Sequence, residues 1–233
     1  MTMHIKALTF DTGGTILDWH HGLSRAFAAA GARHGRQADW ATLTNEYRRR
    51  SLQAMLNAEH PTFNIDDMHR QMLDTMIAES GLEAFTAEDR QAIWRTWHAL
   101  DAWPDFVPAL ARLKAKYIVA SLTILSTSLV IDVSRQNNIV WDCIISCEMI
   151  GTYKPLPEAY QTAATWLALE PSEILMVACH NFDLMAARAV GYRSAFVRRP
   201  TEWGPSGPPD PVPNPAHDLV VDTFFDLAQQ LGA

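Results

Sequence analysis

The chain has 233 residues, of which 48% are hydrophobic and 19% are charged, so it is long enough for one folded domain with an insertion and is not a disordered chain. Its net charge of −7 argues against a nucleic-acid-binding protein, because no basic excess is available to displace counterions. Three cysteines without metal-like spacing, no signal-peptide pattern and no apolar run of about 20 residues predict a cytoplasmic protein without a membrane span.

The first predicted element is a buried strand at residues 5–10, where the apolar run IKALTF ends in the glycine turn DTGG. The residues that follow, up to about 100, show helical patterns and no convincing strand. They predict helices over 20–34, 40–59, 65–80 and 87–100. We interpret the apolar stripes of these helices as packing between them. The stripes are Leu43, Tyr47, Leu52, Met55 and Leu56, then Met68, Met72 and Met76.

From about residue 101, short apolar runs alternate with helical patterns. The runs predict strands over 117–123, 143–146, 174–179, 194–197 and 218–221. The helical patterns predict helices over 104–115, 127–137, 157–168, 182–190 and 222–231. This alternation indicates βαβ units, and therefore an α/β fold with a parallel, Rossmann-like sheet.

The two patterns divide the chain into two parts. We expect a Rossmann-like core from residues 1–18 and 101–233, and an all-helical cap domain from residues 19–100. Such a cap would cover the carboxyl edge of the sheet, where open α/β folds bind ligands. Residues 200–217 contain seven of the 13 prolines and predict an extended loop that crosses the surface before the last strand and helix.

Four polar side chains follow predicted strands at the same edge of the sheet. Asp11 ends the first strand, in the turn DTGGT, and Thr123 closes the strand YIVASLT. Lys154 lies in GTYKPLPEAY, before the next predicted helix, and Asp183 follows the strand ILMVAC. Because the carboxyl ends of parallel strands meet at one edge, these side chains are expected to share a site.

These segments resemble the four motifs of the haloacid dehalogenase superfamily: FDTGGTILDW, a hydroxyl after the second strand, YKPLPEAY and an Asp after the fourth strand. The order, the spacing and the helical insertion after the first motif all match, over essentially the whole chain. The resemblance implies a Rossmann-like core of the haloacid dehalogenase type with a helical cap.

One position within the first motif separates the activities of this superfamily. Its phosphatases carry a second Asp two residues after the nucleophile, where this chain has Gly13. A phosphate ester leaves as an alkoxide, which needs a proton from that acid, whereas a halide leaves as a stable anion. The chain is therefore similar to the L-2-haloacid dehalogenases, also called type II haloacid dehalogenases.

The resemblance implies a reaction without metal or cofactor. Asp11 would displace the halide from a short 2-haloalkanoic acid, and water would hydrolyse the resulting ester to the 2-hydroxy acid. Lys154 would keep Asp11 ionised, and Asp183 would either orient Lys154 or activate the water. The expected partner is the halogenated acid, with no nucleic acid and no membrane.

Substrate binding is expected at the first motif. The peptide N–H groups of Thr12 and Gly13, with the hydroxyl of Thr123, would hold the substrate carboxylate. Thr15 is either the motif's second hydroxyl or a threonine that stabilises the turn.

Three further positions match the family by their place in the chain. Arg48 matches the cap arginine that receives the departing halide, with Arg49 and Arg50 as alternatives because three consecutive arginines cannot all point inward. Tyr160 would line the pocket or pack within its helix. His180 stands where the family usually has Asn, and it either polarises the water or only lines the site.

Two other functions remain open at this point. A Mg²⁺-dependent phosphatase or phosphonatase would use Asp11 and Asp183 with an unusual acid. A non-catalytic family member is suggested by Ile124 and Ala178, which replace an Asn and a Ser of the family. A homodimer surface is one interpretation of the cap tryptophans, and burial in the core is the other. These tryptophans are Trp40, Trp94 and Trp97.

Overall fold

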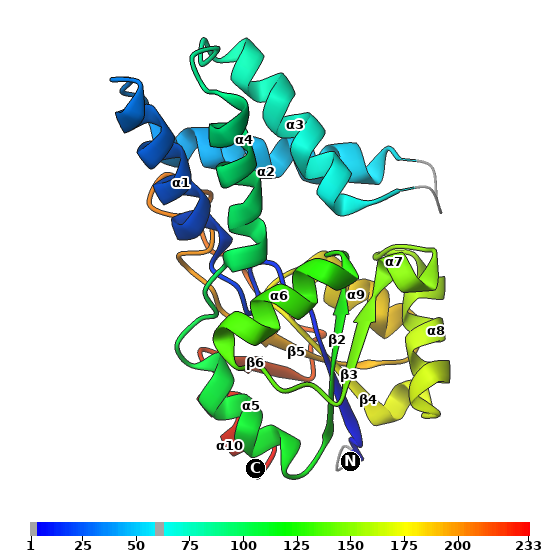
Figure 1. Cartoon of the computed structure of the whole chain (residues 1–233). Coiled ribbons are helices and arrows are strands. Elements are labelled where there is room, and N and C mark those ends of the chain that lie inside the picture. Colours follow the sequence, from blue (N-terminus) through cyan, green and yellow to red (C-terminus); the bar gives the residue numbers. More distant parts are fainter. Residues whose placement is uncertain (1–3, 59–62) are drawn as a thin grey trace.

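The computed structural model describes residues 4–58 and 63–233. Within these residues, parallel strands form one six-stranded sheet in the order β3-β2-β1-β4-β5-β6 (Figure 1). The strands are β1 (Ala7–Phe10), β2 (Ile118–Thr123), β3 (Cys143–Ser146), β4 (Ile174–Ala178), β5 (Arg193–Val197) and β6 (Leu219–Val221). The predicted α/β fold with a parallel sheet is confirmed, and β1 begins two residues later than the apolar run suggested.

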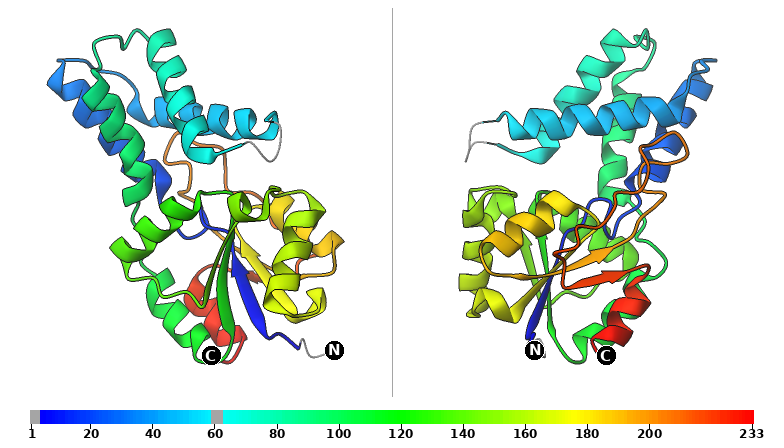
Figure 2. Two further views of the ribbon diagram at one scale, coloured as in Figure 1. Left: turned by 45° about the vertical axis from the view of Figure 1, so that its right-hand side comes forward. Right: turned by 180° about the vertical axis from the view of Figure 1, so that it is seen from behind.

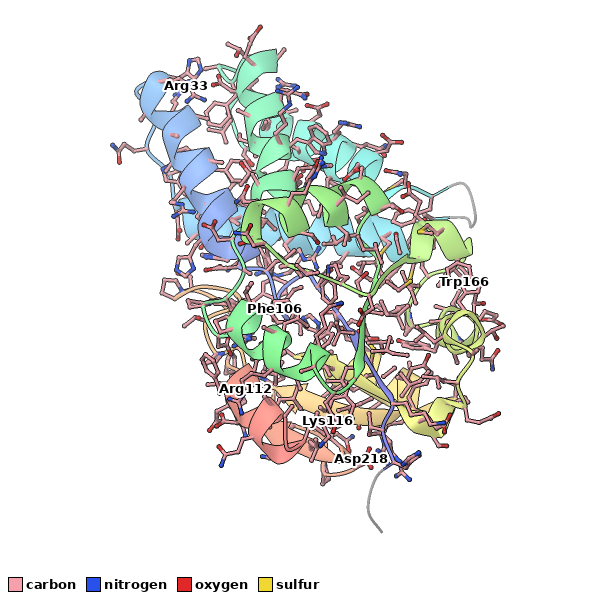
Figure 3. The ribbon with its side chains drawn as sticks, turned by 60° about the horizontal axis from the view of Figure 1, so that its bottom comes forward. Arg33, Phe106, Arg112, Lys116, Trp166 and Asp218 are labelled. Atoms are coloured by element: carbon pink, nitrogen blue, oxygen red, sulfur yellow. The ribbon has the colours of Figure 1, made fainter. Side chains whose placement is uncertain are left out.

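Strands β1 and β4, at the centre of the sheet, are buried along their whole length because helices cover both faces of the sheet. Apart from Thr9 in β1, their residues are apolar, so they do not show the alternation of a half-exposed strand. On one face lie α5 (Phe106–Lys114), α6 (Thr127–Asn137) and α10 (Phe224–Gln230). On the other lie α8 (Pro157–Leu167) and α9 (Asn181–Ala189). Figure 3 shows α5 and α10 side by side, with Phe106 on α5.

A layer of helices stands above the carboxyl ends of the strands (Figure 2). It consists of α1 (Trp19–Arg33), α2 (Trp40–Leu56), α3 (Ile65–Glu79), α4 (Ala87–Arg95) and the 3₁₀ turn η1 (Thr96–Ala99). The four predicted helices of this region are present; the predicted end of the second, at residue 59, lies outside the described residues. The chain enters the layer at Asp18 and leaves it at Asp101, where the Asp18 N–H donates to the Asp101 carbonyl (2.9 Å). This pairing brings the two ends of the helical segment together, and the division into core and cap stays a prediction.

The cap helices begin where the sequence supplies a capping side chain. Asp18 accepts a hydrogen bond from the N–H of His21, and Asp39 accepts one from Thr42. Asn64 caps α3 in the same way, and Thr86 forms a capping box at the start of α4. Such caps satisfy N–H groups that a helix leaves unpaired at its start.

Three features differ from the sequence-based predictions. A short helix, α7 (Cys147–Ile150), follows β3, and a 3₁₀ turn, η2 (Pro171–Glu173), precedes β4. The start of the proline-rich segment is not a surface crossing: Glu202 is buried, and the Trp203 carbonyl accepts a hydrogen bond from Asn45 of α2 (3.0 Å). No helix among the described residues is long and apolar enough to cross a lipid bilayer.

Candidate active site

Three predicted catalytic side chains meet at the carboxyl edge of the sheet. Asp11 follows β1, Lys154 lies in the loop between α7 and α8, and Asp183 is in the first turn of α9. The Lys154 Nζ lies 2.9 Å from Asp11 Oδ1 and 2.5 Å from Asp183 Oδ2. All three side chains are buried, so this ammonium group links two carboxylates away from water.

The charges of this trio fix its protonation. Burial alone would raise the pKa of Asp11, but the Lys154 ammonium and the nearby His180 hold it well below its usual range. Burial alone would lower the pKa of Lys154, but the two carboxylates raise it. Burial, together with the like charge of Asp11, raises the pKa of Asp183. The result is an ionised Asp11 beside a charged Lys154, as a nucleophile requires.

Both oxygens of Asp183 are already engaged. Its Oδ2 accepts from Lys154, and its Oδ1 accepts from the Tyr160 hydroxyl at 2.5 Å. Tyr160 is fully buried and does not line the cavity, so of the two placements considered for it the structure favours packing over a place in the pocket wall. Of the two roles open for Asp183, this geometry favours the orientation of Lys154.

The second oxygen of the nucleophile has its own partners. Asp11 Oδ2 accepts from the Thr15 hydroxyl at 2.6 Å and lies 3.2 Å from His180 Nδ1. The Thr15 hydroxyl in turn accepts from the N–H of Cys179 (3.1 Å). Thr15 therefore combines both roles considered for it, since it contacts the nucleophile and ties the first turn to the end of β4.

A cavity of about 390 Å³ opens beside Asp11, between the sheet edge and α2. Apolar side chains form much of its wall, and Leu52, Met55 and Leu56 contribute it from α2. Met55 and Leu52 also pack against the hydrophobic core, as predicted, whereas Leu56 is exposed. The lining residues are Asp11, Gly13, Arg48, Leu52, Met55, Leu56, Ile124, Lys154, Pro155, His180, Phe182, Asp183, Glu202 and Trp203.

Arg48 is the member of its arginine run that reaches this cavity. Its side chain is buried, whereas Arg49 and Arg50 form ion pairs with acidic residues at the surface. The guanidinium lies over the rings of Trp97 (5.3 Å) and Trp19 (5.8 Å). Its Nε and Nη1 atoms have no hydrogen-bond partner among the described residues. Such unpaired, buried donors in a cavity wall suit an anion.

The residues predicted to bind the substrate carboxylate do not all line the cavity. Gly13 lines the cavity, and a Cβ at this position would lie 3.3 Å from Arg48 Nη2, so an acidic side chain here would enter the space of the guanidinium. The Thr12 and Thr123 hydroxyls are buried and bonded to each other (2.5 Å). Thr123 also accepts from the Leu125 N–H (3.1 Å) and does not line the cavity, so its hydroxyl is less available to a substrate than predicted.

Glu202 belongs to the site and was missed by the sequence reasoning. Its Oε1 accepts from the Trp19 indole N–H (3.2 Å) and lies 3.1 Å from His180 Nε2. Burial alone would raise the pKa of Glu202, but His180 and Trp19 hold it below its usual value. One signal in the sequence could have indicated Glu202: it follows the fifth predicted strand closely, at the edge of the sheet where the other site residues lie.

The donor atoms suit hydrogen bonds better than a resident metal. Among the described residues, one group of three potential ligands is close enough to share an ion: Cys179, His180 and Glu202. Each is already paired within the group. A Mg²⁺ ion held by the nucleophile and the α9 carboxylate does not fit either, because the Lys154 ammonium lies between these two groups.

Comparison with known proteins agrees with this geometry. The family model described as haloacid dehalogenase-like hydrolase matches residues 5–191. The (S)-2-haloacid dehalogenase 1 of Pseudomonas sp. (strain CBS-3) is 28% identical over 203 residues, which cover 84% of this chain and 85% of that protein. A solved defluorinating L-2-haloacid dehalogenase is 38% identical, with a TM-score of 0.91 and coverage of 98% of this chain and 96% of that chain. A second solved L-2-haloacid dehalogenase is 36% identical, with a TM-score of 0.90 and coverage of 98% and 99%. On this basis, the chain belongs to the family of haloacid dehalogenase-like hydrolases.

Proposed function

We propose that this protein hydrolyses short 2-haloalkanoic acids to 2-hydroxy acids and halide, through an ester on Asp11. The observation that carries this proposal is the Asp11 carboxylate, paired with Lys154 at 2.9 Å and facing a cavity, with Gly13 in place of a second acid. The names of the relatives with similar sequence and structure, which are 2-haloacid dehalogenases, support the same reaction.

In the first step, one Asp11 oxygen attacks the α-carbon of the substrate and the carbon–halogen bond breaks. The halide keeps the bonding electrons and leaves as an anion, so no acid is needed at this point. Because the cavity holds both reactants together, the attack becomes effectively intramolecular, and its effective molarity can reach about 10⁵ M. Attack from the side opposite the halogen would convert an L-substrate into a D-product.

Two groups of donors suit the two ends of an anionic substrate. The unpaired Nε and Nη1 of Arg48 suit the departing halide, as the resemblance implies. The peptide N–H groups of Thr12 and Gly13 have no acceptor among the described residues, and they suit the substrate carboxylate. Lys154 keeps Asp11 ionised throughout the displacement.

Halide release from (S)-2-chloropropionate, measured with and without a chelator, tests the reaction. We expect release that the chelator leaves unchanged and that Asp11→Asn abolishes. Mass spectrometry after turnover in ¹⁸O-labelled water is expected to find the label in the Asp11 carboxylate, because water attacks the carboxyl carbon of the ester. Hydrolysis of a phosphate ester only with Mg²⁺, without halide release, would instead favour the phosphatase alternative.

The intact catalytic pair also argues against a non-catalytic protein. Ile124 lines the cavity and Ala178 is buried in β4, but neither disturbs the contact between Asp11 and Lys154.

A cytoplasmic location and a homodimer stay predictions. Trp97 and Trp94, which were considered as parts of a homodimer surface, are largely buried, and this favours the interpretation that they belong to the core.

A further inference from the structure

The His180 imidazole lies between two carboxylates. Its Nδ1 is 3.2 Å from Asp11 Oδ2, and its Nε2 is 3.1 Å from Glu202 Oε1. The Glu202 carboxylate is itself held by the Trp19 indole N–H (3.2 Å) and by the Cys179 thiol (3.6 Å). The ring therefore has a fixed orientation, with one nitrogen toward the nucleophile and the other toward a buried anion. This is the relation of acid, imidazole and reacting group found in hydrolytic triads.

Other groups near Asp11 are poorly placed to accept a proton. Lys154 and Arg48 are cations. Both oxygens of Asp183 accept hydrogen bonds within the protein, at 2.5 Å each. His180 lines the same cavity, and its Nδ1 is a lone-pair acceptor in the neutral tautomer that keeps its proton on Nε2, toward Glu202 Oε1.

We propose that His180 and Glu202 form a catalytic dyad for the second half of the reaction, in which water hydrolyses the ester on Asp11. His180 Nδ1 removes a proton from the attacking water, while Glu202 orients the ring and stabilises the imidazolium that forms. The dyad presupposes the ester, so it rests on the proposed function. His180 is the catalytic residue, and Glu202 is a positioning residue.

The charge of Asp11 controls when His180 can act. Burial alone would lower the pKa of His180, but Cys179, Glu202 and Asp11 hold it well above its usual value. Arg48, which approaches from α2, interacts electrostatically with the same two carboxylates. In the free enzyme the ring is therefore an imidazolium that donates to both carboxylates. Ester formation removes the charge of Asp11, so the ring then releases its Nδ1 proton to solvent and becomes a base.

The protons balance over the cycle. The first step forms the carbon–oxygen bond of the ester, breaks the carbon–halogen bond and releases one proton from His180 to solvent. In the second step, water oxygen bonds to the Asp11 carboxyl carbon and the ester C–O bond on that side breaks. Of the two water protons, one leaves on the hydroxyl of the product and the other stays on His180. The sum is one water consumed and one proton, one halide and one hydroxy acid released.

Rapid-quench kinetics of His180→Ala with (S)-2-chloropropionate separates the two steps, because alanine removes the imidazole without restoring the Asn that the family usually has here. We expect a fast burst of one chloride per active site, followed by an ester on Asp11 that intact-protein mass spectrometry detects. Breakdown of that ester should be at least about 100-fold slower than in the wild type, the smaller end of what a general base contributes. The matched control is His34→Ala, because His34 also pairs with a carboxylate, Asp89 (2.6 Å), but in the cap and away from the cavity. It should turn over like the wild type.

Glu202→Gln tests the positioning role with a side chain of the same shape. Removing the negative charge lowers the pKa of His180. The rate of ester breakdown should therefore begin to rise at a lower pH than in the wild type, and its maximum at high pH should be lower. A residue that only supports the fold would slow both steps and leave the midpoint of this profile in place. Because the substitution conserves size, the profile remains a test if His180→Ala fails to fold.

The outcomes separate the two proposals. Ester breakdown at the wild-type rate in both variants, or loss of the chloride burst with an unmoved pH profile, overturns the dyad. Failure of the proposed function looks different, because the wild type itself then releases no chloride and forms no ester.

Discussion

Gly14 determines how closely Glu202 can approach the first turn. Its φ of +88° lies in the left-handed region, and a Cβ there would come within 2.1 Å of Glu202 Oε1. The glycine therefore serves two needs at once, a turn directly after the nucleophile and space for a carboxylate from a distant loop. A side chain at position 14 would push Glu202 away from His180.

The arginine run provides a matched pair of variants. Arg48→Lys replaces a planar guanidinium, held over two tryptophan rings, by a single ammonium, and it removes the unpaired Nε donor. We expect kcat/KM for halide release from 2-chloropropionate to fall about 10- to 100-fold, the value of one hydrogen bond to a charged group. The exposed Arg49→Lys is the control, and it should stay within about two-fold of the wild type. Equal effects of the two substitutions would show that Arg48 does not bind the anion.

The sequence was informative for residues at the ends of strands. Asp11, Lys154 and Asp183 were predicted to meet because carboxyl ends of parallel strands share one edge, and they lie within hydrogen-bond distance. The partners of His180 and Asp183 were not predictable in this way. Glu202 and Tyr160 reach them by packing between distant segments, which local patterns do not encode.

At the scale of elements, helix α2 shows the limit of periodicity. Its apolar positions were recognised, and Tyr47 is indeed fully buried in the core. Leu52 and Met55 have the same helical spacing, yet they line the cavity. A 3.6-residue period shows that a face is apolar, but it does not distinguish a face covered by protein from one that faces a substrate.

Leu52→Ala should widen the cavity and change the preferred substrate length. We expect the ratio of kcat/KM for 2-chlorobutyrate over chloroacetate to rise about ten-fold or more, because one methylene in an apolar pocket is worth about 1–3 kcal/mol. Leu43 on the same helix packs against the core but does not line the cavity, so Leu43→Ala should lower the melting temperature without changing the ratio. An unchanged ratio in Leu52→Ala would mean that α2 does not contact the substrate chain.

Contacts between η1, α3 and α6 tie the cap to the core in a pH-dependent way. His98 Nδ1 lies 2.8 Å from Asp132 on α6, and its Nε2 lies 3.5 Å from Asp66, which also accepts from the Ser126 hydroxyl (2.7 Å). The Asp66 and Asp132 carboxylates raise the pKa of His98 above its ordinary value. Because the pKa of His98 is higher in the folded protein than in the unfolded chain, protonation of His98 stabilises the fold. This stabilisation is fully present below the unfolded-state pKa of about 6.5 and is lost as the pH rises through the folded-state pKa.

Melting curves of the wild type and His98→Asn across pH measure this contribution. The difference in melting temperature should be greatest below about pH 6.5 and should shrink as the pH rises above it. A difference that is constant across this range would mean that the charge on His98 does not hold the cap.

At the scale of the whole molecule, the order of the strands was not predictable, but the parallel sheet and the two groups of helices were. Alternating runs and helical patterns were sufficient to recognise βαβ units, because crossover helices bury both faces of a parallel sheet. The order β3-β2-β1-β4-β5-β6 depends on pairings between remote segments, which composition and spacing do not reveal.

That strand order has a consequence for how the chain folds. β1 lies in the middle of the sheet, and its Ala7 is opposite Ile118 on one side and Ile174 on the other. Its first pairing must therefore wait until the whole cap has been synthesised, and its second until β4 emerges from the ribosome. During that interval the chain exposes an apolar strand with open edges, so non-local pairing and not helix formation sets the pace of folding. The nucleophile at the end of β1 is consequently made before both neighbouring strands and is placed only after the second of them has formed.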